Sequence, residues 1–378
     1  MTKISATWLS SDAAQTVCSM LTDAGYQAWL VGGCVRNTLL DQPVADLDLS
    51  TDAAPKKVMQ LAKAANIKAI PTGFDHGTVT LVAADTPIEV TTFRRDVATD
   101  GRRATVAFAD NITDDARRRD FTMNAIYAAP DGQIADPLVG LPDLYARQVR
   151  FIEDADQRIK EDYLRILRFF RFYAWYGDPA QGPDVDGLAA CADNIEGLQS
   201  LSLERTSAEI LKMLSAPDPA PAVSAMASTG ALAQVLPGAH AGALAVLVHL
   251  EQQIGLLPDP IRRLAVLGGQ PMQAMRLSKA QSRRLNRITG ALSSIEASYR
   301  FGNDVGRDMC LVQAASLGQA IDAKMLSKID SAAKQRFPLK AADLMQDLSG
   351  PALGEALTKA EDRWIASGFT LTKAQLLD

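Results

Sequence analysis

The sequence has few of the residues that build disulfides or transition-metal sites. Its 378 residues include only four cysteines and three histidines, with no CxxC pair and no HD, HxH or HExxH cluster. This pattern excludes a disulfide framework and argues against a zinc site or an HD-type phosphohydrolase. Any metal ion must therefore be held by carboxylates, which are typical ligands of magnesium. The residues concerned are Cys18, Cys34, Cys191, Cys310, His76, His240 and His249.

Long hydrophobic runs are also missing. The longest, AGALAVLVHL at residues 241–250, is too short to span a bilayer and contains His249. No basic segment followed by an apolar one comes after Met1, so we expect no secretory or transit signal. With 47% hydrophobic and 22% charged residues, the composition is that of an ordinary globular protein. We therefore predict a cytoplasmic protein without membrane association, and nothing in the sequence indicates a protein partner.

The formal net charge of −5 argues against indiscriminate nucleic-acid binding. The basic residues are nevertheless clustered, and local basic stripes can bind RNA phosphates on one face of an acidic protein. For any one cluster, a solvated helix face is an equally good interpretation. The three groups are Arg117, Arg118 and Arg119; Arg158, Lys160, Arg165, Arg168 and Arg171; and Lys279, Arg283, Arg284 and Arg287.

Strand and helix patterns alternate up to about residue 150, and only helical patterns follow. Runs rich in β-branched and aromatic residues predict strands, and a helix is expected near residues 56–65. The fold class is therefore α+β: a head with a mixed sheet, followed by an all-helical part. The proline-containing segments 178–183 and 215–223 are expected to be loops. The predicted strands are 26–31, 44–50, 78–82 and 88–93.

The segment LVGGCVRNTLLDQPVADLDLST, residues 30–51, combines a double glycine, an arginine and two aspartates. Side chains alternate along a strand, so Asp46 and Asp48 would point to one face with Cα atoms about 6.6 Å apart. Carboxylates at this separation can share one or two divalent ions. Charged residues that protect an edge strand are the alternative, and for a lone DxD pattern the more frequent one.

The residues upstream favour the metal-binding interpretation. Gly32 and Gly33 allow a positive φ and a close approach of the backbone to phosphate oxygens. Arg36 follows as a charge-assisted donor to the same group. Together these parts predict a nucleotidyl-transfer site, in which the turn binds a triphosphate and the aspartates bind magnesium. Glu89, on another predicted strand, is a weaker candidate for a third carboxylate, because an exposed structural residue explains it as well.

A second basic segment, ARRRDFTMNAIY at residues 116–127, places three arginines before an aspartate. Such a run suits contacts with phosphate or ribose. A salt-bridged helix end explains it equally well, so the segment alone decides nothing.

One long helix is predicted over QRIKEDYLRILRFFRFYAWYG, residues 157–177. Asp162 and Arg165 are three residues apart and would lie side by side on one face, where an ordinary salt bridge is one explanation. The pair also matches the Watson–Crick edges of cytosine and adenine, whose amino group donates to a carboxylate and whose ring nitrogen accepts from arginine. Apolar residues at helical spacing would form a core stripe of Ile159, Tyr163, Ile166 and Phe170.

This pair would select between nucleotides. Uracil and guanine present a carbonyl and an N–H at the same positions, so CTP and ATP would be accepted and UTP and GTP rejected. The rejection is worth on the order of a few kcal/mol, because buried polar groups would be left unpaired. Arg168 and Arg171 continue the row but rotate away by about 60° per step, which favours contacts with phosphates or RNA.

Together these segments resemble the class II tRNA nucleotidyltransferases, the CCA-adding enzymes and their poly(A) polymerase relatives. The resemblance covers residues 26–214. One departure is Asn37, where the family usually has aspartate; we expect it to support the turn and activity to survive. The matching segments are residues 30–51 (GG-x-VRD-x-LL…D-x-D), RRDFTMNA from Arg118 (RRDFT-x-NA), DPLVGLPDL from Asp136, EDYLRILRFFRF from Glu161 (ED-x-x-R) and ERTSAEILKML from Glu204.

The resemblance implies a polymerase-β-like nucleotidyltransferase head at residues 1–150, a helical neck with the template helix at 151–215, and a tRNA-binding helical body and tail at 216–378. It implies addition of C, C and A to the tRNA 3′ end from CTP and ATP without a nucleic-acid template, releasing pyrophosphate. Asp46 and Asp48 would be catalytic and would hold Mg²⁺. The residues implied at the nucleotide are Gly32, Gly33, Arg36, Arg119, Asp162, Arg165, Arg168 and Arg171.

Within the family, residues 96–108 resemble the flexible loop that CCA-adding enzymes use to switch from C to A, which disfavours a CC-adding enzyme. A poly(A) polymerase or an A-adding enzyme stays an alternative. A non-catalytic RNA-binding protein is another, although the retained Asp46 and Asp48 argue against it. In the body, residues 278–287 are a candidate phosphate-contacting helix, and a surface helix is at least as good an interpretation.

Overall fold

The computed structural model describes residues 2–100, 103–345 and 348–377, with no side chains described at residues 96–106. The chain divides into two compact units, Met1–Pro237 and Gly238–Asp378. The predicted domain boundaries at 150 and 215 both fall inside the first unit and stay predictions.

A seven-stranded mixed sheet forms the head of the first unit, with the strand order β3-β4-β5-β2-β1-β8-β9. β2 and β5 run parallel, and the other neighbours are antiparallel. The sequence predicts β1, β2, β4 and β5 but not β3, which is largely exposed, or the two-residue strands β8 and β9. The strands are β1 Trp29–Val31, β2 Leu47–Thr51, β3 Lys68–Gly73, β4 Thr78–Ala83, β5 Thr86–Thr92, β8 Tyr127–Ala128 and β9 Ile134–Ala135.

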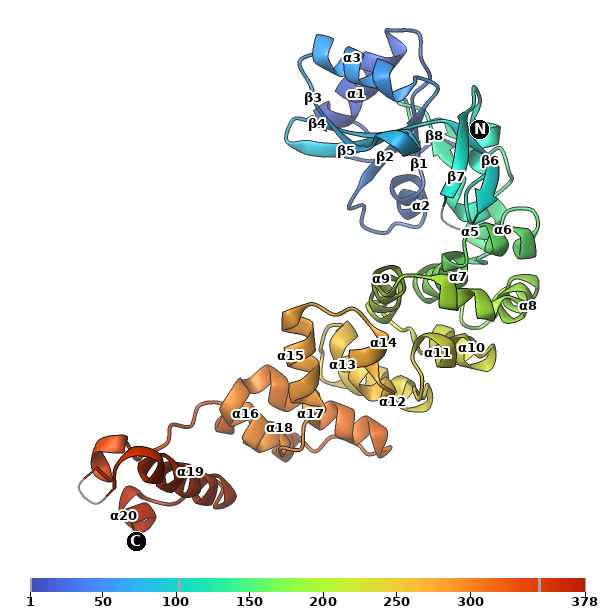
Figure 1. The fold of residues 1–378 in the computed structure, drawn as a ribbon. Helices are drawn as coiled ribbons and strands as arrows, with labels where there is room; N and C mark the ends of the chain where they lie inside the picture. The colour runs from blue at the N-terminus through green and yellow to red at the C-terminus, as the bar shows by residue number, and fades with distance from the viewer. Residues whose placement is uncertain (1, 101–102, 346–347, 378) are drawn as a thin grey trace. The chain divides into compact units, whose positions relative to one another are not determined.

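Helices cover both faces of this sheet. Figure 1 shows α1 (Asp12–Thr22) and α3 (Pro55–Ala64) on one side and α2 (Gly33–Leu39) on the other. α1 contacts β4, and α3 contacts β3 and β4. The helix predicted near residues 56–65 is α3, which starts with a proline in its first turn.

Residues 96–108, predicted as a flexible loop, belong to two further strands. β6 (Arg94–Asp100) and β7 (Arg103–Phe108) pair antiparallel in a separate two-stranded sheet. Residues 101–102 and the side chains of 96–106 lie outside the described residues, so the role of this segment in switching from C to A stays a prediction.

Beyond β9 the named elements of the described residues are all helices, so the predicted α+β head followed by a helical part is confirmed. Residues 178–183 form a loop as predicted, but residues 215–223 do so only in part, because α10 begins at Ala220 with Pro221 in its first turn. No helix of the described chain is long and apolar enough to cross a membrane.

The helices of the first unit are α4 Ile112–Arg117, α5 Leu141–Tyr145, α6 Ala155–Glu161, α7 Leu164–Tyr176, α8 Val185–Asp193, α9 Leu203–Leu214, α10 Ala220–Ser228 and α11 Ala231–Val235. Those of the second unit are α12 Gly242–Gln253, α13 Pro260–Leu267, α14 Pro271–Ala274, α15 Lys279–Ile288, α16 Ser294–Phe301, α17 Asn303–Ser316, α18 Ala323–Ala332, α19 Gly350–Ala366 and α20 Lys373–Leu377.

The prediction of one continuous helix over residues 157–177 is wrong. α6 ends at Glu161 and α7 begins at Leu164, because Asp162 adopts an extended conformation with φ −156° and ψ 104°. The Asp162 carboxylate accepts a hydrogen bond from the backbone N–H of Leu164 at 3.1 Å. An aspartate whose side chain accepts from the backbone two residues on in this way competes with a continuous helix, which is the physical reason for the break.

A buried charge network joins four helices of the second unit. Glu251 accepts hydrogen bonds from Arg262 Nε at 2.7 Å and from Arg263 Nη2 at 2.8 Å. Arg262 also donates to Asp308 at 2.9 Å, and Asp308 in turn pairs with Arg284 at 2.5 Å. α12, α13, α15 and α17 are thereby held in register, since a buried charge without its partner would be costly.

Candidate active site

β1 is followed at once by a tight turn and a short helix. Gly32 has φ +72°, a conformation that favours glycine, and α2 begins at the next residue. A Cβ on Gly32 would lie 3.7 Å from Nη1 of Arg119, and one on Gly33 would lie 3.9 Å from Nη2 of Arg36. The predicted glycine turn and two of the predicted arginines therefore meet.

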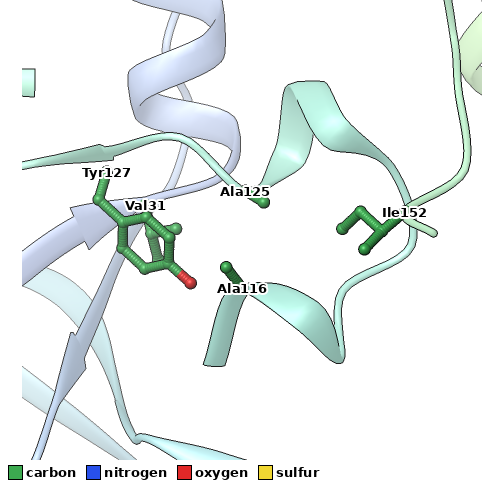
Figure 2. Close-up of a cluster of buried hydrophobic side chains, with 5 residues drawn as sticks. All are labelled: Val31, Ala116, Ala125, Tyr127 and Ile152. Carbon is green, nitrogen blue, oxygen red and sulfur yellow. The ribbon is translucent and has the colours of Figure 1, made fainter. Parts of the chain in front are cut away.

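A small apolar cluster holds this turn against the arginine run. Figure 2 shows Val31, Ala116, Ala125, Tyr127 and Ile152, all buried. Val31 ends β1 immediately before the glycine turn, and Ala116 lies in α4, three residues before the arginine that contacts the turn. Tyr127 in β8 turns its hydroxyl toward α4, which joins the apolar cluster to the charged groups described below.

Three carboxylates gather on the neighbouring strands β2 and β5. Asp48 lies in β2, and Asp46 is exposed just before that strand. Glu89 in β5 is the direct register partner of Asp48 in the parallel pair. Burial raises the pKa of the Asp48 carboxyl above its usual value, and Glu89 and Asp46 raise it further, while Arg119 and Arg36 act in the opposite direction. Glu89, a weak candidate in the sequence, is thus beside the predicted metal ligands.

This charge distribution fits a divalent cation, because a bound cation would offset both the burial of the Asp48 carboxylate and its repulsion by Glu89 and Asp46, which raise its pKa. Among the described residues, no group of three or more histidine, cysteine, aspartate or glutamate side chains is arranged to hold a metal ion. The protein would therefore supply only part of the coordination shell. Substrate phosphates and water commonly complete such a shell around Mg²⁺.

Arg119 belongs to a buried network around Asp115. The Asp115 carboxylate accepts from Arg119 Nη2 at 3.0 Å, from Arg118 Nε at 2.8 Å, from the Tyr127 hydroxyl at 2.9 Å and from Ser50 Oγ at 3.2 Å. Burial raises the pKa of the Asp115 carboxyl, but the two guanidinium groups lower it more, so it lies well below its usual range. Asp115 is therefore ionised, and it fixes Arg119 beside the glycine turn.

A second buried carboxylate, Asp120, connects the arginine run to α7. It accepts from Arg168 Nε at 2.7 Å and from Asn124 Nδ2 at 3.0 Å. Burial raises the pKa of the Asp120 carboxyl, but Arg168 and Asn124 lower it to about 2. The amide oxygen of Asn124 in turn accepts from Arg36. A continuous chain of polar contacts thus runs from the glycine turn to the helix that was predicted as the template.

The helix predicted to carry both Asp162 and Arg165 is interrupted between them, although the backbone N–H of Arg165 still donates to the backbone oxygen of Asp162 at 2.9 Å. Asp162 pairs with Arg205 of α9 at 2.6 Å. Arg165 pairs with Glu161 at 2.6 Å and donates to the backbone oxygen of Arg118 at 3.0 Å. The two side chains are held by separate partners, each of which fixes its orientation.

The other predicted arginines of α7 are also paired. Arg171 contacts Glu209 of α9 at 2.5 Å and lies 4.7 Å from the centroid of the Phe172 ring. An ion pair within one helix or turn, such as that of Glu161 with Arg165, can be predicted from the sequence, because its members are three or four residues apart. The long-range pairs of Asp120, Arg205 and Glu209 have none, so the sequence could not predict them.

The second unit carries a separate basic site around α15. A pocket of about 630 Å³ is lined by α13, α15, α16 and α17 residues including Arg283, Arg287 and Arg307. Arg287 lies 4.4 Å from the centroid of the Phe301 ring. Most arginines of the three predicted basic groups form ion pairs with carboxylates. In the described part of the chain, Lys279, Arg283 and Arg287 of α15 form no ion pair with a carboxylate. Of the three basic groups, the one on α15 therefore has the most positive charge available to bind an anion.

The head and its glycine turn define a class of protein. Residues 28–150 match the family model "Poly A polymerase head domain", and residues 185–242 match "Probable RNA and SrmB- binding site of polymerase A". The fold resembles that of the CCA-adding enzyme of Bacillus stearothermophilus in complex with CTP, with a TM-score of 0.71, 27% identity, and coverage of 94% of this chain and 92% of that one. The class is therefore the nucleotidyltransferases with a poly(A) polymerase head, as the resemblance predicted.

Relatives narrow the class. The CCA-adding enzyme of Lacticaseibacillus paracasei is 30% identical over 384 residues, covering 97% of this chain and 94% of that one. The human mitochondrial CCA tRNA nucleotidyltransferase 1 is 38% identical over 207 residues, which are 54% of this chain and 48% of the human one. That alignment thus spans about half the length of the human relative. The chain belongs to the family of CCA-adding tRNA nucleotidyltransferases.

Proposed function

We propose that this protein is a CCA tRNA nucleotidyltransferase, which adds C, C and A to the tRNA 3′ end from CTP and ATP. The observation that carries the proposal is that Asp48 is the register partner of Glu89 and that the charges of Asp46, Arg119 and Arg36 also act on it. Carboxylates facing arginines beside a glycine turn suit a metal-bound triphosphate. The relatives named for CCA addition supply the choice of substrate.

In the proposed reaction, the tRNA 3′-oxygen attacks the α-phosphorus of the nucleotide in line. A new P–O bond forms, the bond to the β-phosphate oxygen breaks, and pyrophosphate leaves. Asp46 and Asp48 would hold Mg²⁺, which stabilises charge on the attacking and leaving oxygens when bound. Gly32 and Gly33 offer their backbone to the phosphates, and Arg36 and Arg119 offer positive charge.

Base selection is proposed for Asp162 and Arg165, with Arg168 and Arg171 supporting that site. Asp162 uses one oxygen for the N–H of Leu164 and the other for Arg205. A carboxylate oxygen has two lone pairs, so each oxygen keeps one for the amino group of cytosine or adenine. The partners Arg205 and Glu161 would hold the template residues in place before the nucleotide arrives.

The proposed function is tested with a tRNA transcript that ends at its discriminator base, incubated with magnesium and CTP, ATP or both. We expect two nucleotides to be added with CTP alone and three with both, resolved on a sequencing gel. A ladder of A residues with ATP alone would instead show a poly(A) polymerase, and a single A on CC-ended primers only would show an A-adding enzyme. No extension would favour an RNA-binding protein without catalytic activity.

We further propose that residues 1–150 are the catalytic head, 151–215 the neck with the template residues, and 216–378 the tRNA-binding body and tail. The available basic residues of α15 support the last assignment. Arg283 and Arg287 line the pocket beside Phe301, an aromatic ring that is 37% exposed. Arginine next to an accessible ring suits RNA, since phosphates contact the charge and bases can stack on the ring.

Replacing both Arg283 and Arg287 by alanine is expected to weaken tRNA binding about tenfold. The negative slope of the logarithm of the tRNA association constant against the logarithm of the salt concentration should become shallower by about 1.5. The reason is that two phosphate contacts no longer release counterions. Filter binding over a series of salt concentrations measures both values. The matched control removes Lys324 and Lys328, two exposed lysines of α18, and equal effects in both variants would contradict a specific role of α15.

A further inference from the structure

Arg36 is a buried cation that has no acidic partner in contact. Its side chain is only 6% exposed. Within the described residues it forms no ion pair, and its Nε has no hydrogen-bond partner. Asp120, whose charge acts on Arg36, is already paired with Arg168. A buried guanidinium in such surroundings must be held by neutral groups, because its burial is otherwise costly.

Three neutral side chains accept hydrogen bonds from Arg36: Asn37, Asn124 and Tyr176, the last residue of α7. The Tyr176 hydroxyl accepts a hydrogen bond from Arg36 Nη2 at 2.8 Å. The centroid of its ring lies 4.1 Å from the guanidinium carbon, compared with 5.1 Å for the Phe172 ring. One side chain therefore provides both a hydrogen bond and a cation–π contact, which together fix the position of the guanidinium.

Asn37, the residue next to Arg36 in the chain, provides a neutral contact and no charge. An aspartate at residue 37 could orient the guanidinium by an ion pair. Here Asn37 Oδ1 accepts from Arg36 Nη2 at 3.0 Å, while the amide nitrogen of Asn37 donates to the Pro43 oxygen at 2.8 Å. The amide is neutral and is shared with the turn, so it holds Arg36 more weakly than a carboxylate would.

We propose that Tyr176 is a positioning residue, which holds the guanidinium of Arg36 toward the triphosphate where residue 37 provides no carboxylate. The proposal rests on the proposed function, because it takes Arg36 to contact the triphosphate. It ties the end of α7 to the glycine turn. The phosphate-binding arginine and the helix that carries the template residue Arg165 are then aligned by one side chain.

The test compares the affinities for CTP and CMP, both with magnesium, by calorimetry on the full chain. CMP lacks the β- and γ-phosphates, so only CTP affinity should depend on Arg36. We expect Tyr176→Leu to weaken CTP about 10- to 30-fold and CMP less than about twofold. Tyr176→Phe keeps the ring and should cost about threefold for CTP. Asn37→Asp added to Tyr176→Leu should restore CTP affinity to within about threefold of the wild type.

A purely structural role of Tyr176 would give a different result. CTP and CMP would then weaken equally, and Asn37→Asp would restore neither, which would overturn the proposal. Trp175→Leu is the matched control, because it removes the neighbouring aromatic side chain, which contacts Lys212 at 2.8 Å and not Arg36. If Tyr176→Leu does not fold, as judged by its thermal melt, the comparison of Tyr176→Phe with and without Asn37→Asp decides in the same way.

The outcome is separable from the proposed function. Extension of tRNA by the wild type tests the function, whereas the ratio of CTP to CMP affinity tests the positioning. An active wild type with equal losses for both nucleotides in Tyr176→Leu would keep the function and reject the positioning. If the wild type does not extend tRNA but Tyr176→Leu loses affinity for CTP alone, the function would be rejected and the positioning of Arg36 kept.

Discussion

Asp48→Asn is expected to reduce nucleotide addition by at least about 10³-fold while the protein stays folded. The substitution keeps the size of the side chain but removes the charge that would hold the metal ion, and metal stabilisation of the reacting oxygens is worth several kcal/mol. Asp46→Asn should have an effect of the same order. Single-turnover extension of a tRNA primer measures the loss, with CTP at saturating concentration.

The stability of Asp48→Asn gives an independent readout. The pKa of the Asp48 carboxyl is raised in the folded protein, chiefly by burial and then by Glu89 and Asp46. Ionisation of Asp48 is therefore less favourable in the folded than in the unfolded protein. At a pH above the pKa that Asp48 has in the unfolded chain, its charge thus lowers the free energy of unfolding. Without magnesium, Asp48→Asn should melt at the wild-type temperature or slightly above it at neutral pH. A lower melting temperature would mean that the activity was lost through misfolding.

Glu89→Gln is the matched control, because Glu89 faces Asp48 from the neighbouring strand. If Glu89 only adds negative charge near the site, its loss should cost about tenfold or less. A loss as large as that of Asp48→Asn would instead make Glu89 a third metal ligand. Full activity of Asp48→Asn would contradict the proposed site altogether.

The sequence predicted the parts of this site that are local in the chain. Gly32, Asp46 and Asp48 lie within 17 residues of one another, so strand alternation and glycine conformation place them without knowledge of the fold. The same holds for strands β4 and β5, whose alternation of buried and less buried residues is visible in the sequence. Interactions between residues close in the chain were sufficient to predict these strands and this part of the site.

Two features could not be obtained in this way. The break at Asp162 depends on a choice between a continuous helix and an interrupted one, and the surrounding apolar periodicity favoured the wrong alternative. The partners of the arginines depend on tertiary contacts, such as Arg168 with Asp120, which is 48 residues away. The clustering of basic residues in the sequence therefore overestimated the number of cations available to RNA, because most of them are already paired.

Asp162→Asn is expected to lower the ratio of kcat/KM for CTP to that for UTP about 10²-fold. The carboxylate can only accept hydrogen bonds, so it faces the uracil carbonyl as acceptor against acceptor and excludes it. An asparagine amide can turn to donate to that carbonyl, which relieves the exclusion, while the contact with the cytosine amino group becomes weaker. Discrimination of this kind is large because a mismatched base leaves buried polar groups unpaired.

Asparagine at residue 162 can still accept the N–H of Leu164, so the beginning of α7 should stay intact. The measurement is the addition of CTP and of UTP to the same tRNA primer by each variant. Asp156→Asn is the matched control, since this half-buried carboxylate lies on α6, where it pairs with Lys160 at 2.5 Å and accepts from Asn194 at 2.8 Å. Its nucleotide ratio should equal that of the wild type. A lower rate with both nucleotides and an unchanged ratio in Asp162→Asn would mean that Asp162 only accepts from the N–H of Leu164 and holds Arg205, and base selection would then have to come from other residues of the neck.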